Sequence, residues 1–333
     1  MFLLTDGLSR ISQALRLRDL ASGLANGLTA LLGVVFPPEF VARVTASVQL
    51  PELAYATVTI LAWLAVFLCF MLVIETLFAP KRSPYTSRTF VQDVLYALFY
   101  QGGFYNALLW TGLVNVLNSR MSFLKIEVLS QLPPIGHLLI YWVIVDFLTY
   151  WWHRSLHTWG PLWAFHSVHH TQEEMSFITA YRMHPVEQLC QNLIMVVPLL
   201  VLGVPTQRWL SVFVVMNLLE GFQHTALTWG YGRAYYVFVS PRFHAVHHSA
   251  DPSHFNSNYA KLLSIWDFLF GTAIRADRMP ERLGVDGLPV PRTIGAQLLA
   301  PFVILFGRRS PADPSTVAAA PMPTPRSASG GAR

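Results

Sequence analysis

Histidines in three short motifs are the residues of this chain best suited to chemistry. The motifs are HRSLH at residues 153–157, HSVHH at 166–170 and HAVHH at 244–248. Residues three and four apart share one face of a helix, so each motif would gather its imidazoles on one side. Neutral imidazole is a good ligand for Fe, Zn, Cu and Ni. The spacing therefore predicts a metal site built from helices.

The number of histidines indicates two metal ions. One ion takes roughly four to six ligands, and the motifs supply more imidazoles than that. The alternative is a basic face that senses pH. We expect the metal ligands to be His153, His157, His166, His169, His170, His244, His247 and His248. His224 is a ninth candidate, and His184 in RMHPVE is a tenth with weaker spacing.

Two acidic residues share predicted helical faces with these histidines. Asp146 lies two turns before His153, and Glu220 lies one turn before His224. An ionisable side chain within a membrane span is costly and points to a functional site. We expect Asp146 to orient a histidine through its second ring nitrogen. For Glu220 both this role and metal binding stay open, and no catalytic residue is predicted beyond the metal centre.

Proline and serine positions predict where the histidine-bearing helices begin. Gly160 and Pro161 break the helix that carries HRSLH, and Pro161 suits the start of the next helix, which carries HSVHH. Ser240 suits the N-cap and Pro241 the first residue of the helix that carries HAVHH.

The composition indicates a membrane protein. Hydrophobic residues make up 53% of the 333 residues and charged residues 12%, with a mean hydropathy of +0.42. An average soluble domain carries about 25% charged residues. The net charge of +5 is scattered along the chain, so no nucleic-acid partner is predicted. The two cysteines, Cys69 and Cys190, exclude a cysteine-ligated iron–sulfur cluster and do not support a disulfide framework.

The hydrophobic pattern predicts an all-α, multi-pass transmembrane bundle with a histidine-rich helical cap. A span needs roughly 20 apolar residues, and four stretches fit: residues 53–78, 135–152, 186–204 and 209–227. Residues 20–36 predict a weak span or an interfacial helix, and 91–117 one kinked span or a re-entrant pair. Residues 294–306 are too short to span and are expected on the surface.

Four segments follow from this pattern. They are an N-terminal segment at residues 1–52, a membrane domain with the histidine cap at 53–274, an interfacial segment at 275–307 and a disordered tail at 308–333.

The order of the spans places the histidine motifs on one face of the membrane. Lys81 and Arg82 directly follow the first strong span and indicate a cytoplasmic loop. If residues 91–117 form a single span, all three motifs and His224 reach the cytoplasmic side, as one site requires. His137, at the opposite end of its span, is then left out.

The chain resembles the fatty acid hydroxylase/sterol desaturase superfamily of membrane di-iron oxygenases over roughly residues 70–274. The resemblance rests on the three histidine motifs, on FQHTAL around His224, on FVSPRFHAVHH at 238–248 and on SNYAKLLSIWDFLFGT at 257–272. One departure is Ala260, which stands where NYG with glycine is usual.

This resemblance implies two iron ions held by the clustered histidines and His224, with O2 as co-substrate. It also implies a lipid substrate, such as a fatty acyl chain or a sterol, in the membrane. No haem-binding HPGG segment is present, so we expect electrons from a separate donor, a reductase with ferredoxin or a cytochrome. The motifs do not separate hydroxylation from desaturation.

Two other classes of function stay open. A non-enzymatic metal transporter would need polar or charged residues along several spans. The predicted spans hold few charged residues, such as Glu75, Asp146 and Glu220. A zinc-dependent membrane hydrolase would use the same histidines without O2. Since the tail shows no retention signal, a bacterial inner membrane is favoured over the endoplasmic reticulum.

Overall fold

The computed structural model describes residues 16–47, 50–79, 85–101, 105, 115–126, 132–203, 206–285, 291 and 293–306. Within these residues the secondary structure is helical, and the only β pairing is one isolated bridge between Ser249 and Leu283. The predicted all-α class is confirmed, while the tail expected to be disordered lies outside the described residues. The chain divides into two compact units, Met1–Phe70 with Val94–Met121, and Met71–Asp93 with Ser122–Arg333.

The first unit contains α2 (Leu17–Val35), α3 (Pro38–Ser47), most of α4 (Leu50–Phe78) and α7 (Asn115–Arg120). Two small residues of α2, Ala21 and Ala25, pack against the start of α4 at Leu50 and Ala54. The opposite side of α2 leaves large apolar side chains exposed. The helix predicted at residues 20–36 therefore exists as α2, but it is not among the described helices apolar enough to cross a membrane.

Two described helices are long and apolar enough to cross a membrane: α4, and the part Ile135–Thr158 of α8 (Pro134–Thr158). The other two predicted spans correspond to α10 (Pro185–Val201) and α11 (Thr206–Gln223), which do not meet the same criteria. With 17 residues, α10 is about 26 Å long, somewhat less than the roughly 30 Å of a bilayer core. Their crossing of the membrane stays a prediction.

Part of the ambiguous stretch at residues 91–117 is described. α5 (Arg88–Gln101) covers its first half and α7 its end, whereas residues 106–114 lie outside the described residues. The number of crossings in this stretch, and with it the side of the membrane that carries the histidines, therefore stays a prediction.

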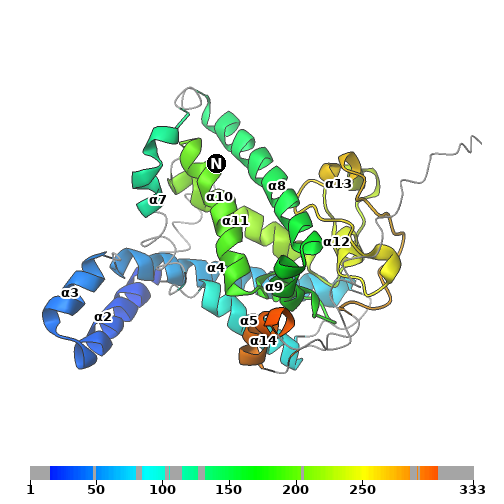
Figure 1. The fold of residues 1–333 in the computed structure, drawn as a ribbon. Coiled ribbons are helices and arrows are strands. Elements are labelled where there is room, and N and C mark those ends of the chain that lie inside the picture. Colours follow the sequence, from blue (N-terminus) through cyan, green and yellow to red (C-terminus); the bar gives the residue numbers. More distant parts are fainter. Residues whose placement is uncertain are drawn as a thin grey trace, which may run out of the picture. The chain divides into compact units, whose positions relative to one another are not determined.

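The second unit is organised around α8 (Figure 1). After Trp159 the chain continues into α9 (Gly160–His170), and α10 packs against both α8 and α9. α11 packs against α12 (Pro241–His247) and against the 3-10 helix η4 (Phe177–Tyr181). α14 (Ile294–Phe306) packs against α9. Helices from three separate parts of the sequence thus surround the histidine motifs.

The predicted helix starts agree with the structure. Pro161 lies in the first turn of α9. At α12 the Ser240 hydroxyl accepts a hydrogen bond from the Phe243 N–H at 3.2 Å, so it satisfies one of the free donors at the helix start. The segment predicted to lie on the surface is α14, whose outer side chains Val303 and Phe306 are exposed.

The segment after α12 folds around the carboxylate of Asp267, which belongs to the short helix α13 (Ile265–Leu269). This carboxylate accepts hydrogen bonds from the backbone N–H groups of Tyr259 and Ala260 and from the Thr272 hydroxyl, at 2.6–2.9 Å. Ala260 is fully buried and has no left-handed backbone. Nothing at this position requires the glycine that the motif led us to expect.

Replacing Asp267 with Ala should lower the thermal unfolding temperature of the detergent-solubilised protein, because each buried donor left without a partner costs about 1–3 kcal/mol. Asp277→Ala is the matched control, since its side chain is 86% exposed and its loss should have little effect. Equal unfolding temperatures for the two variants would contradict this account of the turn.

Candidate metal centre

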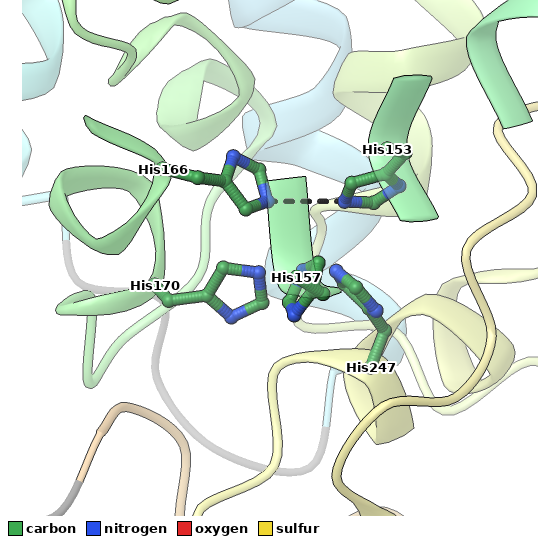
Figure 2. A group of neighbouring side chains, drawn as sticks. All are labelled: His153, His157, His166, His170 and His247. Atoms are coloured by element: carbon green, nitrogen blue, oxygen red, sulfur yellow. Dashed lines mark hydrogen bonds between the residues drawn. The ribbon is translucent and has the colours of Figure 1, made fainter. Parts of the chain in front are cut away.

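Nine histidines meet as two buried clusters. Within each cluster, one nitrogen from every ring lies within 4.8 Å of the others. The five-histidine cluster, drawn in Figure 2, contains His153, His157, His166, His170 and His247. The four-histidine cluster contains His169, His224, His244 and His248. The clusters are neighbours, because the ring centroids of His170 and His248 lie 4.4 Å apart in a stacked contact.

Each HxxHH motif supplies both clusters. In α9 the first and last histidines, His166 and His170, enter the five-histidine cluster, while His169 enters the four-histidine cluster. In α12 the roles are exchanged, since His247 is the one that enters the five-histidine cluster. Residues i and i+4 nearly align on a helix, whereas successive residues point about 100° apart. The spacing had led us to expect that the histidines of one motif share one site. The structure instead divides each HxxHH motif between the two clusters.

Backbone carbonyls fix the orientation of four rings through the Nδ1 atom. His153 donates to the Tyr259 oxygen at 2.7 Å, and His247 donates to the Ser257 oxygen at 2.8 Å. The other two are His169, bonded to the Arg182 oxygen at 3.1 Å, and His224, bonded to the Glu220 oxygen at 2.7 Å. A carbonyl only accepts, so Nδ1 carries the proton, and in the neutral ring Nε2 carries a free lone pair.

A carboxylate plays the same role for a fifth ring. Glu187, in the first turn of α10, accepts a hydrogen bond from His166 Nδ1 at 2.7 Å, and both side chains are buried. The sequence analysis did not identify Glu187 as part of the site. One feature of the sequence could have identified it: Glu187 is an acidic residue at the start of a mostly apolar helix, three residues after His184.

The oriented Nε2 atoms face one another at distances that suit ligands of a common ion. The Nε2 atoms of His153 and His166 are 3.1 Å apart, and those of His169 and His224 are also 3.1 Å apart. In each pair both Nδ1 atoms already hold the proton, so two lone pairs oppose each other unless a cation lies between them. With metal–nitrogen bonds of about 2.1 Å, ligands at right angles lie about 3 Å apart.

Burial disfavours a proton as that cation. Removal from water lowers the pKa of His169, His244 and His248 well below the usual imidazole value, and charges on neighbouring histidines would lower it further. Burial likewise lowers the pKa of His247 to about 3. These four rings are therefore neutral near pH 7, which is the form that binds metal. Both clusters can hold a metal ion.

The carbonyls that orient the rings are themselves held in place. Ser257 and Tyr259 flank Asn258, whose left-handed backbone (φ 56°) lets both carbonyls face the five-histidine cluster. Asp267 ties this turn down, as described above. On the other side, the fully buried Arg182 donates to Asp93 at 2.6 Å, so an ion pair fixes the carbonyl that His169 uses.

Three predicted site residues have other partners. His184 lies outside both clusters, where its Nδ1 accepts from the Val186 N–H and caps α10. Asp146 was expected to orient a histidine; instead its carboxylate accepts from the backbone of residues 262 and 263 and from Trp266 Nε1. The side chain of Glu220 pairs with Lys261 at 2.7 Å, and only its backbone oxygen contacts His224.

The fatty acid hydroxylase family matches residues 138–272, the region that carries all nine clustered histidines. This part of the chain is therefore similar to the fatty acid hydroxylase family. The resemblance suggested a longer region, from about residue 70, than the family match covers.

Relatives with curated names align over a similar region. The ornithine lipid hydroxylase OlsE of Rhizobium tropici is 31% identical over 174 residues, 52% of either protein. The alkylglycerol monooxygenases of Danio rerio and Homo sapiens are 38% and 36% identical over 129 residues, 38% of this chain and 28% of theirs. The chain thus spans about half or less of these relatives. No solved structure gives a significant match.

Because the two clusters share no histidine, we expect them to lose metal independently. His224→Ala should lower the metal content from about two ions per chain to about one, because it removes a ligand from the four-histidine cluster alone. Elemental analysis of purified protein measures this. His184→Ala is the control; it should keep both ions and lose only a helix cap worth about 1 kcal/mol. An equal loss of metal in both variants would contradict the assignment.

Glu187→Gln should weaken metal binding about 10–100-fold, because the second partner of a ligand histidine sets its orientation and basicity. Competition with a chelator gives the affinity. Glu173→Gln, at an exposed position, is the matched control and should leave the affinity unchanged. Wild-type affinity in Glu187→Gln and Glu187→Ala alike would show that the carboxylate has no such role.

Proposed function

We propose that this protein is a membrane-bound di-iron oxygenase that uses O2 and external electrons to hydroxylate a lipid, with desaturation as the alternative outcome. The observation that carries the proposal is the pair of facing Nε2 atoms in each cluster, His153 with His166 and His169 with His224. Each pair is placed to hold a cation between its lone pairs, which supports a centre with one ion in each cluster.

Iron is proposed over other metals because residues 138–272 match the fatty acid hydroxylase family. Nine imidazoles alone would also suit zinc or copper. Two irons held by the five-histidine and four-histidine clusters would supply the O2 activation that oxidation of a C–H bond requires. The protein's own part is to hold the rings in one tautomer and to keep water out.

The residues around the clusters are suited to orienting the rings and excluding water. All nine rings are buried, and the five Nδ1 donors described above cannot rotate without breaking a hydrogen bond. One small cavity reaches the five-histidine cluster and is lined by His157, His170 and His247 together with Trp163 and Phe255. Its volume of about 30 Å³ suits a molecule the size of water or O2, which needs about 10–15 Å³.

A lipid substrate is supported by the setting and by the relatives. The chain is a membrane protein, and two relatives are named for a hydroxylase of ornithine lipids and a monooxygenase of alkylglycerols. We assign the electrons to a separate donor, and we place the clusters on the cytoplasmic side because basic residues follow α4 directly.

The acidic residues within predicted spans do not favour metal transport. Glu75 accepts from the Ala226 N–H at 2.9 Å and from the Tyr85 hydroxyl. Asp146 and Glu220 are likewise occupied by neighbouring groups of the protein. A transport path would instead need polar groups free to bind a passing ion.

Purified protein loaded with iron under reducing conditions should contain about two irons per chain and should convert a membrane lipid to a hydroxylated or unsaturated product only when O2 and a reductant are present. His169→Ala and His247→Ala, one from each cluster, should abolish turnover. Mass spectrometry of lipids and metal analysis give the two readouts.

Three outcomes would overturn the proposal. Failure to retain iron after reconstitution would remove the di-iron centre. Product formation without O2 and reductant would favour a zinc hydrolase. Metal flux into vesicles, without oxidised lipid, would favour a transporter.

A further inference from the structure

We propose that α13 and the residues beside it, 262–270, enter the apolar layer of the membrane next to α8 and form a lipid-facing part of the histidine cap. The partner of this surface is the acyl region of the bilayer. The inference requires only that α8 crosses a membrane; it does not rest on the proposed oxygenase activity.

α13 is fixed to the middle of the candidate span rather than to its end. The Trp266 ring lies 5.1 Å from that of Phe147 on α8, and Trp266 Nε1 donates to the Asp146 carboxylate at 2.8 Å. One turn further along α8, the Trp151 ring lies 4.9 Å from the ring of Phe270, which directly follows α13. Figure 1 shows α13 beside α8, well before the point where α8 meets α9.

The position of these contacts along α8 places them at membrane depth. The candidate span begins at Ile135. At 1.5 Å per residue, Phe147 is about 18 Å from Ile135 along the helix axis, and His153 is about 27 Å away. A bilayer core is about 30 Å thick. If the core begins near Ile135, α13 lies beside its interior, while the histidines lie near its far boundary.

The backbone of the segment is prepared for an environment without water. Non-helical backbone is tolerated at membrane depth only where its polar groups have partners in the protein. The N–H groups of Leu262 and Leu263 both donate to Asp146 at 3.0 Å. The Leu262 carbonyl accepts from the Val239 N–H at 2.9 Å. The buried carboxylate of Asp146 thus accepts hydrogen bonds from backbone N–H groups of residues 262–270 that would otherwise lack a partner within the membrane.

The outer face of α13 is apolar and exposed. Ile265 and Leu269, one helical turn apart, are 45% and 66% exposed, while the polar Asp267 points inward and is fully buried. The neighbouring residues Tyr236 and Phe238 are also exposed, and Tyr236 contacts Phe268 with ring centroids 4.9 Å apart. Large exposed apolar side chains grouped in this way mark an interaction surface.

The neighbouring surface of α8 indicates that lipid contacts the exposed face of α13. Leu148 and Trp151 of α8 are exposed, and Trp151 contacts Phe270 at the end of α13. The outer side chains of α8 face lipid if the helix crosses the membrane. The exposed face of α13 therefore continues a lipid-facing surface. Tyrosine and tryptophan at its border are the residues found where a protein meets the membrane–water boundary.

Depth measurement in liposomes tests the proposal. Leu269→Cys, in a background where Cys69 and Cys190 are replaced by Ala, is labelled with a small fluorophore in the full-length protein. Quenching by lipids with a nitroxide on the acyl chain should be several-fold stronger than quenching by iodide in the water. Ser253→Cys is the control, since Ser253 is exposed on the short 3-10 helix η6 (Pro252–His254) of the cap and should show the reverse preference.

Ile265→Cys provides a second, independent label in case one position perturbs the fold. Quenching by iodide as at Ser253, at both positions, would overturn the proposal. Protection from both quenchers would also overturn it, because the surface would then be covered by protein. Neither readout involves metal or turnover, so a failed oxygenase assay leaves this result unaffected.

Discussion

The hydrogen bond from a histidine Nδ1 to a fixed acceptor is the interaction on which the site depends. A ring that can rotate offers either nitrogen to a metal, and its free-energy cost of ordering is then paid on binding. Here five rings are locked by four carbonyls and one carboxylate. The locked Nε2 atoms already stand at ligand distance, so most of the ordering is completed when the chain folds.

Buried carboxylates further from the rings hold in place the backbone that orients them. Asp267 closes the turn that presents the Tyr259 carbonyl, and Asp93 neutralises Arg182, whose carbonyl serves His169. Glu75 holds the backbone just after His224. None of these acids lies within hydrogen-bond distance of a clustered histidine ring in the described part of the chain. They are distant supports, and removing one partner of such a buried pair is far more costly than losing a surface contact.

The sequence predicted the parts of this structure that depend on side-chain type and short spacing. The histidine motifs, the break at Pro161 and the Ser240 cap are all local, and the family that the motifs resemble matches residues 138–272. The carbonyl partners could not be predicted, since every residue has a carbonyl and only the folded turn aims it. The partners of Asp146 were missed for a related reason. Its carboxylate accepts hydrogen bonds from backbone N–H groups that lie more than a hundred residues further along the chain.

The division of each HxxHH motif between the two clusters has a consequence for how such a centre can diversify. Because α9 and α12 each contribute to both clusters, the pitch of these two short helices helps to set the distance between the clusters. His153 and His157 on α8 and His224 after α11 complete the two clusters around this pair of helices. A segment that supplies neither a clustered histidine nor a group that orients one can therefore change in length or lining without altering the spacing that α9 and α12 set.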